Sequence, residues 1–217
     1  RARATRTRAG VDGAVALTAR SRSAPALCIR RSRDRSWRRP RRDGPGFVAP
    51  SRAPPPRGTD TQNNDPARAG KTSYWDERYT KDPEPFDWYQ RYSGIQELLQ
   101  KYVKKDDAVL MAGCGNSRLS EDMFEDGFAN ISNVDISRVV IDQMGDKYKD
   151  KPALTFQQMN VCSLEFPDES FDAVIVKGTM DAILCGEGST ANVAKMCMEV
   201  SRVLKPSGIL FVVSYGV

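Results

Sequence analysis

The sequence predicts an α/β fold with a doubly wound parallel sheet over residues 71–217. Short apolar runs in this segment alternate with stretches whose apolar residues recur three and four positions apart, as on one face of a helix. Strands and helices that alternate in this way form right-handed βαβ units. A glycine-bearing turn, Gly113-Cys114-Gly115, follows the first apolar run, as it does in nucleotide-binding folds of this class.

The apolar pattern places each element in turn. The first helix is expected over residues 95–103, and later helices are expected from Leu119 to a stop at Gly127, after a Ser137 cap to Tyr148, and over residues 193–204. Five strands are expected at residues 109–113, 131–135, 154–160, 171–176 and 209–213, with a turn at 205–208 before the last. We expect these strands to lie in the order 3-2-1-4-5.

The N-terminal segment has a different composition. Residues 1–70 contain 17 Arg, 5 Asp and no Lys, a formal charge of +12, with one Trp and one Phe. Such a stretch buries too little apolar surface to offset its ordering entropy, so a disordered extension is predicted for residues 1–70. An organelle transit peptide and an RNA-binding tail are two functional interpretations. Because the first methionine is Met111, we favour a third, that this leader is foreign to the native protein.

The composition of residues 71–217 excludes several function classes. With 16 basic and 23 acidic residues its formal charge is −7, so nucleic acid is not expected to bind the folded domain. The chain has no histidine, which excludes Ser-His-Asp and Cys-His catalysis and His-ligated zinc. The five cysteines form no Cys-x-x-Cys pair and indicate reduced thiols, and no apolar run reaches the ~20 residues of a membrane span. We expect a soluble, monomeric, cytoplasmic protein without a metal, or an organellar one if the leader is a transit peptide.

The turn after the first strand is the first candidate binding motif. Gly113 and Gly115 would let the backbone approach a ligand that a β-carbon would block, although an isolated turn of this kind is equally compatible with a purely structural role. Asp135 follows twenty positions after Gly115, at the end of the second strand. A carboxylate there can accept both hydroxyls of a ribose. Helix capping before Ser137 is the alternative, and the joint spacing favours the ribose.

The third motif and a missing glycine indicate the ligand. Asn160 closes the third strand, where an amide can hydrogen-bond an adenine edge, and Met159 and Val161 can enclose the purine ring. Taken alone, an ordinary strand end explains these residues as well. A dinucleotide site needs a third glycine for its pyrophosphate, and Arg118 stands at that position. A nucleoside without pyrophosphate does not need it, so S-adenosylmethionine fits and NAD does not.

Four motifs carry a family resemblance, which covers residues 74–217. They are Tyr74–Tyr79, Phe86–Tyr89, Gly113–Ser117 and Val176–Ala182, in this order. Together they resemble the class I methyltransferases that modify lysine on eukaryotic translation elongation factor 1-alpha. Within that family the sequence resembles the type linked to endothelin-converting enzyme 2, to which the methyltransferase-like 13 proteins are related. The stretches 166–172 and 202–208 also match class I methyltransferases generally.

The resemblance implies a Rossmann-like fold and a set of cofactor contacts. Carried over by position, these are Trp75, Tyr79, Trp88, Gly113, Asp135, Ile136, Asn160, Val161 and Lys177, to which the turn adds Gly115. On a helix Trp75 and Tyr79 share a face and would cover the methionine end of the cofactor, or else anchor the helix to the sheet. Lys177 would pair with the cofactor carboxylate, with a surface loop lysine as the alternative. Asp181 is a weak candidate for orienting the incoming amine, and no other catalytic residue is assigned.

The implied activity is transfer of a methyl group to a lysine of elongation factor 1-alpha. Alternatives are another acceptor, RNA or a small molecule, and a non-catalytic interaction protein.

Two positions depart from the family pattern, with Met111 where many relatives have an acid and Asn160 where many have Asp. Class I enzymes usually add a sixth and a seventh strand, whereas this chain stops at Val217 after the fifth. We therefore expect an incomplete domain that binds cofactor poorly and is a candidate for lacking activity.

Overall fold

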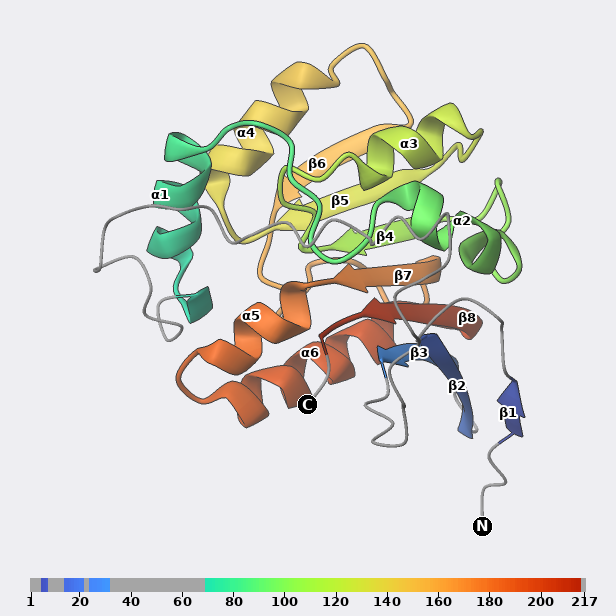
Figure 1. The fold of residues 1–217 in the computed structure, drawn as a ribbon. Helices are drawn as coiled ribbons and strands as arrows, with labels where there is room; N and C mark the ends of the chain where they lie inside the picture. Colours follow the sequence, from blue (N-terminus) through green and yellow to red (C-terminus); the bar gives the residue numbers. More distant parts are fainter. Residues whose placement is uncertain (1–4, 8–13, 22–23, 32–68, 216–217) are drawn as a thin grey trace, which may run out of the picture.

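One sheet organises the molecule, with eight strands in the order β1-β2-β3-β8-β7-β4-β5-β6 (Figure 1). The computed structural model describes residues 5–7, 14–21, 24–31 and 69–215. Five strands from the second half of the chain run parallel to one another. They are β4 (Val109–Ala112), β5 (Ile131–Asp135), β6 (Leu154–Gln158), β7 (Phe171–Lys177) and β8 (Leu204–Val213). Their order is the predicted 3-2-1-4-5, which is confirmed.

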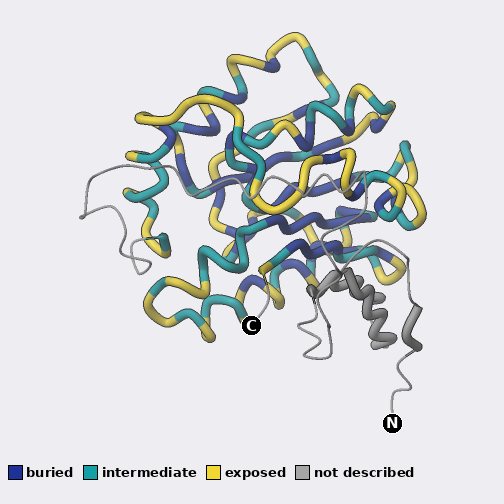
Figure 2. The backbone as a smooth tube through the Cα atoms, in the orientation of Figure 1, coloured by how far each residue is buried: buried dark blue, intermediate teal, exposed yellow. Residues whose placement is uncertain are grey.

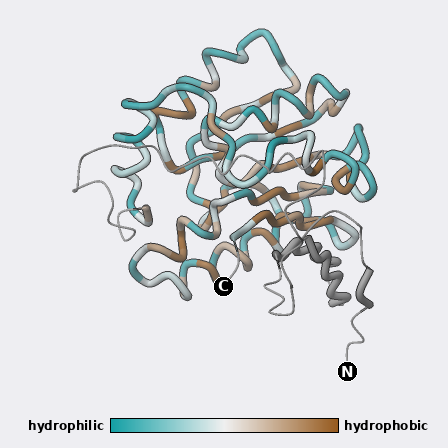
Figure 3. The backbone as a smooth tube through the Cα atoms, in the orientation of Figure 1, coloured by the Kyte–Doolittle hydropathy of each residue, from teal (hydrophilic) through white to brown (hydrophobic). Residues whose placement is uncertain are grey.

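Helices cover both faces of these five strands. They are α1 (Thr72–Lys81), α2 (Tyr92–Gln100), α3 (Leu119–Glu125), α4 (Arg138–Lys147), α5 (Thr179–Cys185) and α6 (Ser189–Val203). Val109 and Met111 of β4 pack in one core cluster with residues of α1 to α4, whereas Leu110 packs in a second cluster with residues of α6. Alternate strand side chains thus enter opposite layers. Figures 2 and 3 show the consequence, because the strands at the centre are buried and mostly hydrophobic.

Local signals account for most helix ends. Ser137 caps α4 as predicted, because its hydroxyl accepts a hydrogen bond from the Val140 N–H at 3.4 Å. Gly127 has φ +96° just after α3, the conformation expected of a helix stop. The first predicted helix, α2, begins earlier and ends at Gln100, so Val103 lies beyond it although its side chain is buried. The sequence analysis missed α5, which has no buried residue and therefore no apolar stripe to detect.

The last strand corrects the turn predicted at residues 205–208. β8 already begins at Leu204, which pairs with Phe171, and Ile209 then pairs with Ala173. Four residues of β8 therefore lie opposite Asp172 alone, which makes the segment a bulge within the strand. The Asp172 carboxylate holds this bulge by accepting hydrogen bonds from Lys205 Nζ at 2.8 Å.

The leader contributes three further strands. They are β1 (Thr5–Thr7), β2 (Ala14–Ser21) and β3 (Ala24–Arg31), and β3 runs parallel to β8. The outer edge of β8 offers backbone groups that a further strand can pair, and β3 lies there. The rest of the leader up to residue 68 lies outside the described residues, so the predicted division into extension and domain stays a prediction. No described helix is both long enough and apolar enough to cross a lipid bilayer.

Candidate functional site

A pocket opens at the carboxyl ends of β4, β5, β6 and β7. β4 lies between β5 and β7, so the strand order reverses its direction at β4. Open α/β sheets bind ligands at the carboxyl ends of the strands beside such a reversal. The pocket contains about 940 Å³ of space, its open mouth included. Every predicted cofactor residue lines it, namely Trp75, Tyr79, Trp88, Gly113, Gly115, Asp135, Ile136, Asn160, Val161 and Lys177. Asp181 is not part of the lining.

The glycine turn cannot carry side chains. Gly113 has φ +80°, and a β-carbon on it would lie 2.0 Å from Oγ1 of Thr179, at the start of α5. That hydroxyl is held in place, since it donates a hydrogen bond to the Ala112 carbonyl at 2.9 Å. Gly115 has φ +52°, and a β-carbon there would lie 2.7 Å from the Tyr79 hydroxyl oxygen. Both glycines thus keep the backbone open toward the pocket.

Asp135 lies at the end of β5 with 7% of its surface exposed. Its Oδ2 accepts a hydrogen bond from the Gly115 N–H at 2.9 Å, and its Oδ1 accepts one from the Ser137 N–H at 3.0 Å. Burial raises the pKa of this carboxyl, and the backbone donors oppose the shift. The carboxylate therefore joins the glycine turn to the start of α4. A third backbone hydrogen bond comes from Ile136, and the two oxygens together still have lone-pair capacity for a ligand hydroxyl.

Helix α1 brings two aromatic side chains to the pocket. The rings of Trp75 and Tyr79 stack with centroids 5.8 Å apart and planes at 27°, so they share a face as predicted. Tyr79 is buried, and its pKa is raised by that burial and by the charge of Asp135. Trp75 donates a hydrogen bond from Nε1 to the Ala69 carbonyl at 2.8 Å. Tyr79 therefore anchors α1 beside the glycine turn, and Trp75 forms part of the pocket wall.

Lys177 ends β7 in a buried ion pair. Its Nζ lies 3.1 Å from Oδ1 of Asp87, and the side chains of the pair are 5% and 10% exposed. Nζ also donates a hydrogen bond to the Trp88 carbonyl at 3.2 Å, and Asp87 accepts another from the Ser117 hydroxyl. Burial lowers the pKa of Lys177, and the charge of Asp87 raises it. Lys177 is therefore buried and paired, and the alternative prediction that it is a lysine of a surface loop is wrong.

Asp87 is a site residue that the sequence analysis missed. It comes from the Phe86–Tyr89 segment and links that segment to both β7 and the glycine turn. Its signal in the sequence was its place next to Trp88 inside a family motif, but the pairing with a lysine ninety positions later has no local trace. The segment is therefore attached to the pocket by charge.

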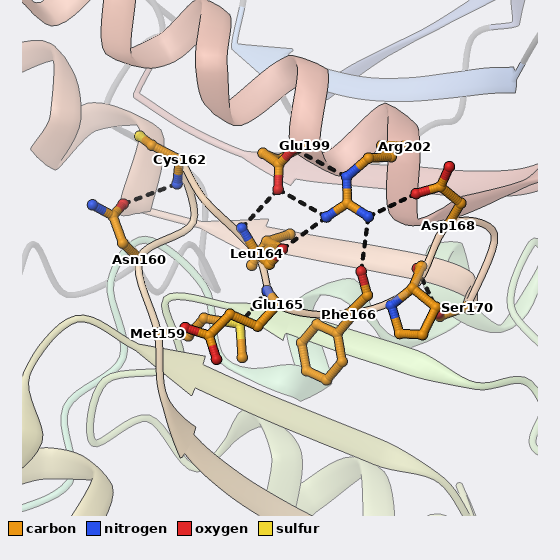
Figure 4. A network of polar contacts seen from close by, with 11 residues as sticks. Met159, Asn160, Cys162, Leu164, Glu165, Phe166, Asp168, Ser170, Glu199 and Arg202 are labelled. Carbon is orange, nitrogen blue, oxygen red and sulfur yellow. Dashed lines mark hydrogen bonds and ion pairs between the residues drawn. The ribbon is translucent and has the colours of Figure 1, made fainter.

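The loop after β6 carries the residues predicted to bind adenine. Met159 and Val161 are buried on either side of the exposed Asn160, whose Oδ1 accepts a hydrogen bond from the Cys162 N–H at 2.9 Å. Arg202 holds the continuation of this loop, as Figure 4 shows. Its guanidinium donates hydrogen bonds, each of 2.8 Å, to the carbonyls of Leu164 and Phe166 and to the Asp168 carboxylate. The loop is thus fixed from α6.

Asp181 lies beside the pocket, in the first turn of α5. Its Oδ1 accepts hydrogen bonds from the Ser214 hydroxyl at 2.9 Å and from the Tyr215 N–H at 3.1 Å. Within the described residues, no three or more cysteine and carboxylate side chains are grouped so as to hold a metal ion.

Comparisons with known proteins indicate what such a pocket serves. Residues 110–212 match the family model of a methyltransferase domain. The mouse EEF1A lysine methyltransferase 4 is 39% identical over 148 residues, which cover 64% of this chain and 58% of that protein. The mouse eEF1A lysine and N-terminal methyltransferase is 41% identical over 143 residues, and 20% of its length is covered. This chain thus spans only part of the relatives it matches.

A solved structure adds evidence on the fold. The PH0226 protein from Pyrococcus horikoshii aligns with a TM-score of 0.50 and 30% identity, over 62% of this chain and 65% of that one. The sheet, the position of the pocket and the matched family model agree with one another.

Proposed function

We propose that this chain, which carries a Rossmann-like methyltransferase domain with S-adenosylmethionine as its cofactor, methylates a lysine of elongation factor 1-alpha. One observation supports the proposal most. Ten residues assigned from spacing and resemblance, taken from six separate parts of the sequence, line a single pocket. The names of the relatives suggest the acceptor, since both modify elongation factor 1-alpha.

The residues present fit this cofactor. Both glycines of the turn have positive φ, and the space that a β-carbon would need is occupied by Thr179 and Tyr79, so the turn packs closely against these pocket-lining residues. Arg118 occupies the N-cap position of α3 where a pyrophosphate site would need glycine. Asp135 would accept the ribose hydroxyls, and Asn160 would bind the adenine edge. The sulfonium end would lie toward Trp75, whose aromatic face attracts cations.

Methyl transfer requires little of the protein beyond positioning the amine and the cofactor. S-adenosylmethionine supplies an electrophilic methyl group, which passes to the lysine nitrogen and leaves S-adenosylhomocysteine and a proton. The chain's contribution is to hold the neutral amine in line with that methyl group and to keep competing water out. Solvent can take the proton before the amine reacts, so a dedicated base is not required.

The proposal is tested with the full chain by calorimetry and by methyl transfer. We expect a saturable heat of binding with S-adenosylmethionine, none with NAD, and incorporation of labelled methyl into elongation factor 1-alpha. The negative charge of residues 71–217 disfavours RNA as acceptor, so labelled RNA serves as the control. No heat of binding would contradict the enzyme, whereas binding without methylation of elongation factor 1-alpha would contradict only the acceptor.

Replacing Asp135 by Ala tests the ribose assignment. We expect at least a tenfold loss in S-adenosylmethionine affinity, about 1.4 kcal/mol or more, because a charged hydrogen-bond acceptor is lost. The matched control is Asp142→Ala, which removes an exposed carboxylate that pairs with Arg138 on α4. Calorimetry on both variants, with circular dichroism to verify folding, gives the answer. Unchanged affinity in a folded Asp135→Ala protein refutes the assignment.

A further inference from the structure

We propose that Asp181 and Tyr89 form the binding site for the ammonium group of the acceptor, at the rim of the cofactor pocket. The proposal rests on the proposed function and specifies the chemistry of its second substrate. Its starting point is an unsatisfied atom. While Oδ1 of Asp181 accepts two hydrogen bonds, Oδ2 is buried and has no partner among the described residues. A buried carboxylate oxygen without a donor is unfavourable and calls for an explanation.

Tyr89 is the neighbour that a ligand would displace. Its φ is +64°, a backbone conformation unfavourable for a residue with a β-carbon, and its side chain is 42% exposed. Its hydroxyl forms a side-chain hydrogen bond with Asp181, while Oδ2 of that carboxylate has no partner among the described residues. Burial and the charge of Asp181 raise the pKa of Tyr89 to about 12, so the hydroxyl stays protonated at neutral pH. Strain and exposure together indicate a side chain that covers Asp181 until a better donor arrives.

The position of this pair connects it to the cofactor pocket. Gly178 lines the pocket, and a β-carbon on it would lie 3.3 Å from Cβ of Trp88 and 3.7 Å from Cε2 of Tyr89. Both rings therefore lie against the same glycine, with Trp88 on the pocket side. Thr179 and Ala182, the neighbours of Asp181 in α5, also line the pocket. Asp181 thus lies next to residues that line the pocket without lining it itself.

The chemistry of this rim selects a cation on a flexible chain. A carboxylate oxygen lacking a donor attracts an ammonium group and repels a phosphate. The faces of Tyr89 and Trp88, both exposed in part, suit an ammonium and the alkyl chain that carries it. A lysine side chain has both features, and a nucleic acid has neither. Ammonium captured at Asp181 would lose its proton to solvent before the amine moves to the methyl group.

The test measures amine binding without turnover. The full chain is labelled with fluorotryptophan and saturated with S-adenosylhomocysteine. n-Butylammonium is then titrated, and the fluorine NMR signal of Trp88 is followed. This signal is assigned by its loss in the Trp88→Phe variant. n-Butanol, an uncharged analogue, is titrated in parallel. We expect n-butylammonium to shift the signal, and Asp181→Asn to weaken its affinity at least tenfold with no change for n-butanol. Asp142→Asn, which removes one exposed carboxylate elsewhere, should behave like the unaltered protein.

The outcomes separate this proposal from the proposed function. Unchanged n-butylammonium affinity in Asp181→Asn would overturn the acceptor site even if elongation factor 1-alpha is methylated. If S-adenosylhomocysteine does not bind the unaltered chain, the proposed function fails first. Tyr89→Phe decides the matter if Asp181→Asn does not fold. It keeps the ring and removes the hydroxyl that competes for Asp181, so n-butylammonium should bind more tightly, and equal or weaker binding would contradict the proposal.

Discussion

Replacing Lys177 by Met is expected to destabilise the protein by about 3–5 kcal/mol, because it leaves the carboxylate of Asp87 buried without its partner. Nine tenths or more of each side chain is shielded from water, so solvent cannot take the place of the missing ammonium group. The Ser117 hydroxyl would remain as a donor to Asp87, but it carries no charge. The change is measured as the free energy of unfolding in urea.

Two further variants show whether the loss comes from an unpaired charge. Combining Lys177→Met with Asp87→Leu removes both charges and should recover most of the stability, since apolar pairs often replace buried ion pairs without loss. Arg138→Met breaks an exposed pair with Asp142 and should cost about 0–1 kcal/mol. A double variant as unstable as Lys177→Met alone would show that packing around Lys177, and not its charge, is what matters.

Gly113→Ala is expected to have an effect of similar size and to abolish cofactor binding. Alanine at φ +80° is strained by about 1–2 kcal/mol, and its β-carbon would overlap Thr179, which adds about 1–3 kcal/mol. The turn would have to move, and with it the backbone that faces the pocket. Calorimetry with S-adenosylmethionine and urea unfolding measure the two consequences.

Gly145→Ala is the matched control for this change. Gly145 lies inside α4, and a β-carbon on it would meet nothing within 4 Å. Alanine is the better helix former, so this variant should gain about 0.5–1 kcal/mol and bind the cofactor normally. A Gly113→Ala protein that matches it in stability and cofactor binding would show that the turn tolerates a side chain.

Local patterns accounted for the five parallel strands, for the cap at Ser137 and for the stop at Gly127. Each of these depends on residues a few positions apart, so each leaves a trace in the sequence. The exceptions have physical reasons. Helix α5 buries no residue and so shows no apolar period, and the bulge at 205–208 depends on Asp172 of the neighbouring strand.

The candidate site was likewise predictable from the sequence only in part. The glycine turn, the carboxylate twenty positions later and the missing third glycine predicted a nucleoside cofactor. The family resemblance supplied most of the ten candidate residues, and all ten line one pocket. The partner of Lys177 was not predictable from them. Asp87 lies ninety positions earlier, and only the folded chain brings the two charges within 3.1 Å.

The sequence by itself therefore determined the class of fold and predicted a nucleoside as the cofactor. Periodicity and turn residues act over short distances along the chain, and the order of a parallel sheet follows from them. Only the tertiary structure decided that Lys177 is paired and that, among the residues it describes, none donates a hydrogen bond to one oxygen of Asp181. These properties depend on which distant groups the chain brings together in a place that water does not reach, and short-range patterns carry no record of that.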